Sequence, residues 1–172
     1  ADADEEAEYA ADDDWLLIHG VHLPDDHGLR GTFVHSPRSN MNNSVGYARP
    51  ARFENPVALG TDGIGADMLE EFRLAYVAAR AADVTITPDL AWQWLSTGWD
   101  LMPAALNDQV VWAAESDDPW ALAFTTGTSP LEVSIEGETV WEDGLPTLVD
   151  GDEIRAKAAE AAKKMFAKLQ EI

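Results

Sequence analysis

The sequence predicts an α/β fold in which parallel strands come first, followed by a small antiparallel β element and a C-terminal helix. Three observations support this order. Short unalternating apolar runs lie before residue 60, apolar residues recur at helical spacing after it, and an alternating pattern with a turn precedes the last helix. A strand buried on both faces reads as a continuous apolar run, whereas an amphipathic helix repeats every three to four residues.

Three apolar runs are the predicted parallel strands. They cover residues 15–18, 32–34 and 57–59, and each is followed by polar residues, glycine or proline. A turn of buried helix is the alternative, but such runs are short for one. Residues 24–31 are also few for a helical crossover, which needs at least about 10–12 residues. Either that crossover is reduced to a turn, or the first two strands are not adjacent.

Two helices are predicted after the third strand. Met68, Phe72 and Tyr76 recur at helical spacing through Arg80, and residues 90–101 follow a proline and an aspartate as a second, Trp-rich helix. We interpret the tryptophans of the second helix as core side chains rather than a ligand platform; they are Trp92, Trp94 and Trp99.

A β-hairpin and a helix are predicted near the C-terminus. Residues 131–135 and 139–141 alternate around Glu136 and Gly137, which favours a hairpin. The last helix has Asp150 or Asp152 as a candidate cap, and three of its lysines lie toward its negative end. One face of this helix is expected to dock on the rest of the protein. It holds Ile154, Ala158, Ala161, Met165 and Leu169.

The charge of the chain excludes some partners. Its 32 acidic residues against 11 Lys and Arg give a formal net charge of -21, which repels nucleic-acid phosphates and anionic lipid surfaces. The acids fit either an acidic partner surface or a coat suited to high salt, and their spread along the chain favours the second reading. With no cysteine, no membrane-length apolar run and no secretion signal, a cytoplasmic location is expected.

Polar side chains stand at the ends of all three predicted strands. His19 and His22 follow the first strand, the segment from His35 to Asn40 follows the second, and Asp62 follows the third. Functional groups of parallel α/β sheets sit at the carboxyl ends of the strands. We therefore expect these residues on one edge, with His19 and Asp62 meeting at a shared pocket, whereas His27 is expected to be exposed.

At these residues the sequence resembles a known family. Residues 17–23, 35–43 and 59–63, in this order, resemble the sixth, seventh and eighth strand motifs of the metal-dependent amidohydrolase superfamily. The branch concerned holds guanine and cytosine deaminases, chlorohydrolases and related aminohydrolases. The resemblance runs from about residue 15 to the C-terminus. It implies the last strands of a TIM-type β/α barrel in residues 15–110, part of a small β-sandwich in 111–149 and a helix in 150–172, after an acidic lead-in in 1–14.

The resemblance also implies a reaction and roles for single residues. Family members hydrolyse carbon–nitrogen bonds other than peptide bonds with water activated by a divalent metal, zinc or iron. The implied substrate is a small amino-substituted heterocycle. Asp62 matches the aspartate that binds the metal and shuttles the proton of the water, and His19 matches the histidine that steadies the water or the developing charge. His22, His35 and Asn40 are the implied substrate-binding residues.

The sequence departs from the family pattern in its metal ligands. Family members carry a His-x-His pair at the first strand and a further histidine with a nearby glutamate at the fifth, but no histidine precedes His19 here. A catalytic zinc takes about three protein ligands plus water, so Asp62 alone cannot hold one. The chain by itself is expected to be inactive, either as a subunit completed by a complementary N-terminal chain or as a remnant.

Two other functions stay open. All four histidines lie within residues 19–35, so a local metal-binding module is conceivable. The chain could also be a non-catalytic acidic interaction or assembly protein, since an incomplete barrel leaves open strand edges that invite a homo-oligomer or another chain.

Overall fold

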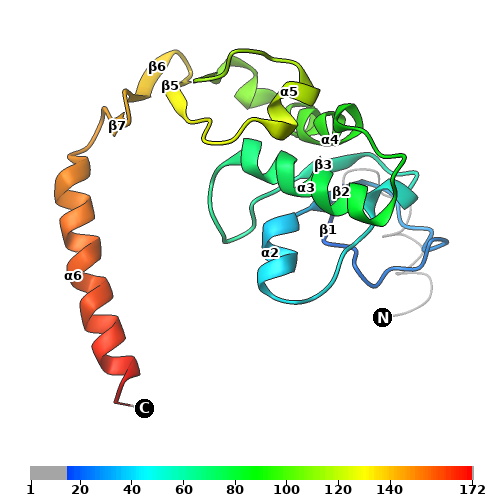
Figure 1. Cartoon of the computed structure of the whole chain (residues 1–172), viewed down its shortest axis with the longest axis horizontal. Helices are drawn as coiled ribbons and strands as arrows, with labels where there is room; N and C mark the ends of the chain where they lie inside the picture. The colour runs from blue at the N-terminus through cyan, green and yellow to red at the C-terminus, as the bar shows by residue number, and fades with distance from the viewer. Residues whose placement is uncertain (1–14, 172) are drawn as a thin grey trace. The chain divides into compact units, whose positions relative to one another are not determined.

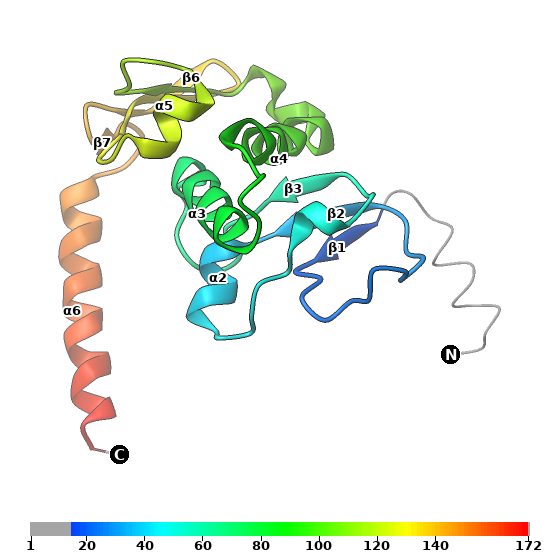
Figure 2. The same ribbon diagram turned by 45° about the vertical axis from the view of Figure 1, so that its right-hand side comes forward.

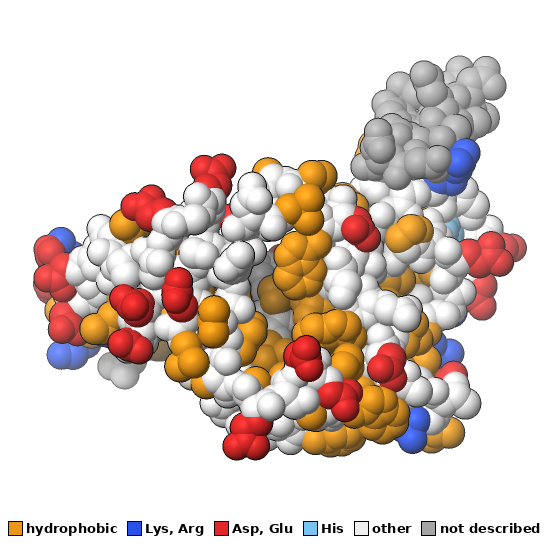
Figure 3. Space-filling model, turned by 90° about the horizontal axis from the view of Figure 1, so that it is seen from above, with side chains coloured by type: hydrophobic (Ala, Val, Ile, Leu, Met, Phe, Trp, Pro, Cys, Tyr) orange, Lys and Arg blue, Asp and Glu red, His pale blue; other side chains and the backbone are white. Residues whose placement is uncertain are grey.

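The computed structural model describes residues 15–171, which form two compact units. The first consists of the described residues up to Pro103 together with Ser116–Thr126, and the second of Ala104–Glu115 together with the residues from Gly127 onward. The boundaries at residues 110 and 149 that the sequence suggested remain predictions. Acidic side chains are scattered over the face shown in Figure 3, in line with their spread along the sequence.

The first unit is built on a three-stranded parallel sheet in the order β1-β2-β3 (Figure 1). The strands are β1 (Leu16–Ile18), β2 (Thr32–His35) and β3 (Val57–Leu59). This confirms the predicted parallel sheet. The segment between β1 and β2 holds only turns, so the crossover is reduced and the two strands are neighbours. Asn55 bridges this segment, because its Nδ2 donates to the carbonyl oxygens of Leu29 and Gly31.

Helices α3 (Met68–Ala82) and α4 (Pro88–Leu101) contact each other and β3 (Figures 1 and 2). Both confirm the predicted helices. Trp94 is buried as expected, and the ring of Trp92 meets Phe72 edge-on, with 5.3 Å between ring centroids. Trp99 is exposed, so its assignment to the core was wrong. It sits near the end of α4, beyond Leu95, the last buried residue of that helix.

Short elements complete the first unit. The helix α2 (Pro37–Asn42) follows β2 directly, with Pro37 in its first turn, where a missing N–H costs nothing. A 3₁₀ turn, η1 (Pro50–Arg52), precedes β3, and α5 (Pro119–Phe124) packs on α3 and α4.

His27 and β1 correct two expectations. His27 is half-buried, meeting Phe33 and Phe53 edge-on, and its Nδ1 accepts a hydrogen bond from the N–H of Leu29. It was expected to be exposed. The strand β1 was expected to be buried on both faces, but its Leu16 and Ile18 side chains are half exposed. Only β2 pairs with it among the described residues, so β1 is an edge strand.

The second unit holds a four-stranded antiparallel sheet in chain order. Its strands are β4 (Gln109–Trp112), β5 (Pro130–Ile135), β6 (Glu138–Glu142) and β7 (Leu145–Pro146), with a 3₁₀ segment η2 (Pro103–Asn107) before β4. The predicted hairpin is β5–β6. Its turn residues Glu136 and Gly137 have φ of 51° and 84°, the pair of positive values that a type I′ turn requires.

The last helix, α6 (Gly151–Leu169), begins as predicted at Asp150, whose side chain accepts from the N–H groups of Asp152 and Glu153. None of its described residues is buried, so nothing in the second unit covers its apolar face, and the docking of this face on the rest of the protein stays a prediction. Capping and ion pairs such as Lys157–Glu153 stabilise the helix locally without such contacts. No helix in residues 15–171 is long and apolar enough to cross a membrane.

Candidate active site

The ends of β1 and β3 bring His19 and Asp62 together. His19 Nε2 lies 3.6 Å from Asp62 Oδ2, a contact between a polar pair rather than a hydrogen bond, and the two side chains are 37% and 44% exposed. This is the proximity expected from the strand ends. Both residues have left-handed backbones, with φ of 67° and 53°. Such conformations are uncommon outside glycine and gather at functional sites.

The position of His19 depends on the glycine that follows it. Gly20 has a φ of +61°, and a Cβ there would lie 2.4 Å from Cε1 of the buried Phe33. A side chain at this position would therefore push the loop off the sheet. The backbone N–H of His19 also donates to the carbonyl oxygen of Val34, which extends the β1–β2 pairing up to the site residue.

Two hydrogen bonds hold the Asp62 carboxylate. Ser39 Oγ donates to Oδ2 at 2.6 Å, and the backbone N–H of Gly63 donates to Oδ1 at 2.8 Å. These two bonds, the Ser39 one first, lower the pKa of Asp62. The residue that caps α3 is Asp67, whose Oδ1 accepts from two N–H groups of the first turn. Asp62 is thus an ionised carboxylate at the sheet edge that no helix end uses.

Ser39 is a site residue that we did not select from the sequence. It lies on α2, is almost fully buried, and its Oγ also accepts a hydrogen bond from Nδ2 of Asn43. An ion pair anchors this helix, since Arg38 Nε donates to the buried Glu71 at 2.7 Å and the N–H of Arg38 donates to the same carboxylate. One signal in the sequence could have identified Ser39. Residues that directly follow β2 lie at the same edge of the sheet as Asp62, because the carboxyl ends of parallel strands share that edge.

Replacing Ser39 tests this support. Ser39→Ala is expected to raise the pKa of Asp62 toward its ordinary value, because the largest of the effects that lower it is removed. NMR titration of the Asp62 side-chain carbonyl carbon in labelled chain measures the pKa. Ser96→Ala, which removes an exposed hydroxyl on α4, is the matched control. An Asp62 titration identical in parent and Ser39→Ala would contradict the assigned role of Ser39.

His35 and Asn40 lie behind this edge and are 2% and 3% exposed. Within residues 15–171, neither imidazole nitrogen of His35 and neither amide atom of Asn40 has a hydrogen-bond partner. Burial first, and then the nearby charge of His19, lowers the pKa of His35 to about 4. The imidazole is therefore neutral at pH 7. The ring of Tyr47 stands edge-on to it, with 5.7 Å between centroids, and burial raises the pKa of Tyr47 to about 12.

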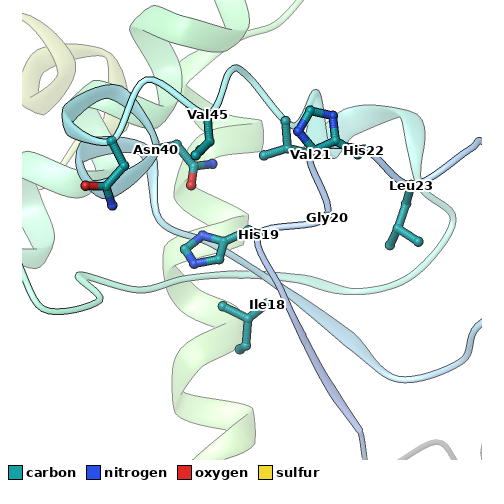
Figure 4. Close-up of a pocket in the computed structure, with 9 residues that line it drawn as sticks. Ile18, His19, Gly20, Val21, His22, Leu23, Asn40 and Val45 are labelled. Carbon is teal, nitrogen blue, oxygen red and sulfur yellow. The ribbon is translucent and has the colours of Figure 1, made fainter.

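A hollow of about 490 Å³ opens in front of His19 (Figure 4). His19, His22 and Asn40 are among its lining residues, together with the apolar side chains of Ile18 and Val45. His22 is itself exposed. The structure thus brings His19, His22 and Asn40 to one hollow and His19 to Asp62, while His35 lines a separate cavity that shares Asn40.

The described residues do not form a metal site. No three His, Asp or Glu side chains in residues 15–171 lie close enough together to hold one ion, and the chain has no cysteine. His19 and Asp62 offer only two metal-binding side chains. One carboxylate oxygen of Asp62 already accepts a hydrogen bond from Ser39. A catalytic zinc takes about three protein ligands. The side chains of residues 15–171 alone therefore do not fit the zinc or iron that the sequence resemblance implies.

Comparison with known proteins supports the resemblance. The 5-methylthioadenosine/S-adenosylhomocysteine deaminase of Shouchella clausii is 31% identical over a stretch covering 43% of this chain and 21% of that protein. A zinc-bound adenosine deaminase from Xanthomonas campestris aligns with a TM-score of 0.67 and 16% identity over 95% of this chain. A mutant atrazine chlorohydrolase from Arthrobacter aurescens, solved with zinc and atraton, aligns with a TM-score of 0.65 and 21% identity over 91% of this chain. No protein-family model matches.

These relatives are longer than this chain. It spans 45% of the adenosine deaminase and 42% of the chlorohydrolase, and the match to the deaminase from Shouchella clausii covers about a fifth of that protein. The parallel sheet, the antiparallel sheet and the terminal helix of the chain therefore correspond to part of a larger α/β fold. In fold and in part of its sequence, this chain resembles the C-terminal portion of the metal-dependent amidohydrolases of the deaminase and chlorohydrolase branch.

Proposed function

We propose that this chain supplies one side of the active site of a hydrolase that cleaves carbon–nitrogen bonds other than peptide bonds. The substrate class is a small amino-substituted heterocycle, as in deaminases and chlorohydrolases. The observation that carries the proposal is the 3.6 Å contact between His19 and Asp62 at the ends of β1 and β3, beside an open hollow. The similarity to the deaminases and the chlorohydrolase supports it.

Asp62 is the proposed proton carrier. In the reaction, the oxygen of water bonds to the carbon that bears the amino group, the carbon–nitrogen bond breaks, and ammonia leaves. Asp62 takes the proton that the water loses and delivers it to the departing nitrogen. The Asp62 carboxylate is ionised at neutral pH and so can accept that proton, and its lowered pKa favours passing the proton on to the departing nitrogen. Ser39 and the N–H of Gly63 hold the carboxylate still during the exchange.

His19 and the lining of the hollow complete the proposed roles. His19 Nε2 lies beside the Asp62 carboxylate, where a hydrogen bond from the imidazole would stabilise negative charge forming on the attacked ring. His22 and Asn40 line the hollow in which the heterocycle would lie, and His35 stands behind Asn40. These three residues are the proposed substrate-binding groups.

The metal requirement is the reason for a partner. Two of the similar structures hold zinc, but the described residues of this chain do not fit such an ion alone. We therefore propose that a complementary polypeptide segment, bearing a His-x-His pair and a further histidine, supplies the other ligands. Without that segment the 172-residue chain is inactive.

Ammonia release tests the proposal. The 172-residue chain incubated with zinc and a panel of amino-substituted heterocycles should release no ammonia. Mixed with a separately expressed chain that carries the missing histidine ligands, it should release ammonia in a zinc-dependent manner. Asp62→Asn should lower that rate by at least about 10³-fold, as loss of a group that acts only in the reaction does.

The control is Asp83→Asn, at an exposed aspartate whose pKa is also lowered, by Thr85. This variant removes the same charge away from the site and should keep the rate of the parent. Zinc-dependent ammonia release by the 172-residue chain alone would contradict the need for a partner. Equal rates for parent and Asp62→Asn in the mixture would remove Asp62 from the reaction.

Assembly is a second candidate function, favoured by the exposed apolar side chains on β1 and α6. Leu16, Ile18, Met165 and Phe166 are more than half exposed. Open strand edges and apolar faces invite association. We expect the isolated chain to form a homo-oligomer at high salt, where its charge is screened. Light scattering over a range of protein and salt concentrations measures this, and a monomer under every condition would contradict it.

A metal module made of the four histidines has less support. His27 packs against two phenylalanine rings, His22 is exposed at the hollow, and His35 is buried. No three metal-binding side chains of residues 15–171 converge. Zinc calorimetry on the parent and on His19→Ala would reveal such a site as saturable binding that the variant loses.

A further inference from the structure

A second cavity, of about 300 Å³, lies beside α2 and carries unsatisfied hydrogen-bonding groups. His35 and Asn40 supply its polar wall, and both are more than nine-tenths buried. Four of their side-chain atoms find no partner among the described residues: Nδ1 and Nε2 of His35, and Nδ2 and Oδ1 of Asn40. The remaining wall is largely apolar and includes Pro37, Met41, Tyr47 and Ala78.

Unpaired buried polar atoms require a physical reason. Native proteins leave few such atoms, because a buried donor or acceptor without a partner has lost its hydrogen bonds to water. Here four of them, each with less than 1 Å² of accessible surface, occur on two side chains that line the same cavity. A molecule bound in the cavity would account for both observations, since the cavity provides the space and a small rotation of the two side chains would bring their polar atoms to its surface.

We propose that this cavity binds an uncharged planar group that carries both a hydrogen-bond donor and an acceptor, such as a carboxamide or the amide-like edge of a heterocycle. The Asn40 side chain can form two parallel hydrogen bonds with such an edge through Nδ2 and Oδ1. A neutral His35 adds one N–H donor and one bare nitrogen acceptor. The inference rests on the proposed function in one respect: the ligand is taken to be part of the substrate.

Asn40 connects the cavity with the hollow in front of His19, because it lines both. A substrate whose reacting carbon lies near His19 and Asp62 could therefore place its far edge against Asn40 and His35. The cavity would then select the substrate by its uncharged edge, away from the bond that is broken. No other described residue lines both spaces.

The electrostatics of the cavity exclude ions. Its lining contains no Asp, Glu, Lys or Arg, so a charged ligand would lose its hydration without meeting an opposite charge. The lowered pKa of His35 keeps the imidazole neutral at pH 7, so it supplies no countercharge to an anion either. The volume is at the lower end of the range of small-molecule sites, which suits a single ring.

Three probes of the same shape test the proposal: benzamide, which is neutral, benzoate, which is an anion, and benzamidine, which is a cation at pH 7. Each is titrated into the 172-residue chain, with the four imidazoles followed by nitrogen NMR and the heat followed by calorimetry. Benzamide is expected to shift the His35 signals saturably with a Kd of about 1 mM. Benzoate and benzamidine are expected to bind at least about tenfold more weakly.

Two asparagines of α2 provide matched variants. Asn40→Ala is expected to weaken benzamide binding at least about tenfold, the effect of losing one or two hydrogen bonds. Asn42→Ala, at an exposed position two residues away, should bind benzamide like the parent. Circular dichroism verifies that both variants are folded. If Asn40→Ala does not fold, His35→Phe replaces it as the test variant, because it puts an apolar ring in place of the imidazole and should likewise weaken benzamide binding.

Three results would overturn the inference. One is the absence of any His35 shift with benzamide at about 10 mM, which would mean that the cavity holds water only. The others are equal binding of the charged probes and unchanged binding by the asparagine variant. Binding is measured without turnover, so it is independent of ammonia release. Asp62-dependent ammonia release by the mixture with the complementary chain, without benzamide binding, would remove this inference alone. Benzamide binding together with no ammonia release by that mixture would remove the hydrolase proposal alone.

Discussion

Lowering the pH from 7 to 4 is expected to reduce the free energy of unfolding by about 3 kcal/mol through His35 alone. An unfolded histidine titrates near 6.5, whereas burial, with the charge of His19, lowers the pKa of folded His35 to about 4. Between these values the unfolded chain binds a proton that the folded chain does not. The stabilisation is therefore complete above pH 6.5, falls as the pH drops, and decreases no further below pH 4.

Urea unfolding at pH 7 and pH 5 measures this effect. The parent should lose about 2 kcal/mol through His35 over this interval, at about 1.4 kcal/mol per pH unit below 6.5. His35→Gln cannot take up that proton and should lose correspondingly less. At pH 5 the carboxylates whose pKa values are lowered, those of Asp62 and Asp83, are still ionised and do not contribute to the difference.

His22→Gln is the matched control, because it removes an exposed histidine from the same part of the chain. It should keep the pH profile of the parent. If the parent and His35→Gln lost equal stability between pH 7 and pH 5, the buried neutral imidazole would be contradicted. The neutral wall of the second cavity would then lose its main support as well.

The sequence predicted the elements whose side-chain pattern is decided locally. The three parallel strands, the helices α3 and α4 and the β5–β6 hairpin all follow from apolar runs, helical spacing or a turn pair. The contact of His19 with Asp62 followed from one further rule, that the carboxyl ends of parallel strands share an edge. Both residues stand directly after their strands, so no long-range packing had to be known.

The residues that were missed depend on contacts across the chain. Ser39 supports Asp62 only because α2 is turned toward β3, and that orientation is fixed by Arg38 pairing with Glu71, 33 residues later. Similarly, His27 is half-buried because Phe53 reaches it from beyond η1. Pairings of this kind leave no periodic signal in the sequence.

The surface that covers the last helix could not be predicted for a different reason. The spacing of Ile154, Met165 and Leu169 shows correctly that they share a face, but a shared apolar face does not specify what covers it. Nothing in the second unit does. The same holds for the outer side chains of β1, where the apolar run was read as burial on both sides. An apolar face in the sequence indicates a tendency to be buried. The surface that buries it must come from elsewhere in the chain or from a partner.

Phe72→Ala is expected to reduce the free energy of unfolding by about 3–5 kcal/mol, the usual cost of deleting a large core side chain. Phe72 is fully buried at 0% exposure, and its ring meets Trp92 edge-on across the α3–α4 contact. The alanine would leave a cavity between the two helices that cover β3. Because Glu71 is the neighbouring residue, loosening α3 would also release its hold on Arg38 and hence on Ser39.

The matched control lies on the same helix. Val77 is 58% exposed, so Val77→Ala should change the stability by less than about 0.5 kcal/mol. Urea unfolding gives both values from the midpoint, and an unchanged slope shows that the loss is in the folded state. A loss of under about 1 kcal/mol for Phe72→Ala would mean that α3 and α4 do not share a close-packed core. The support of Asp62 by α2 through Arg38 and Glu71 would then need another anchor.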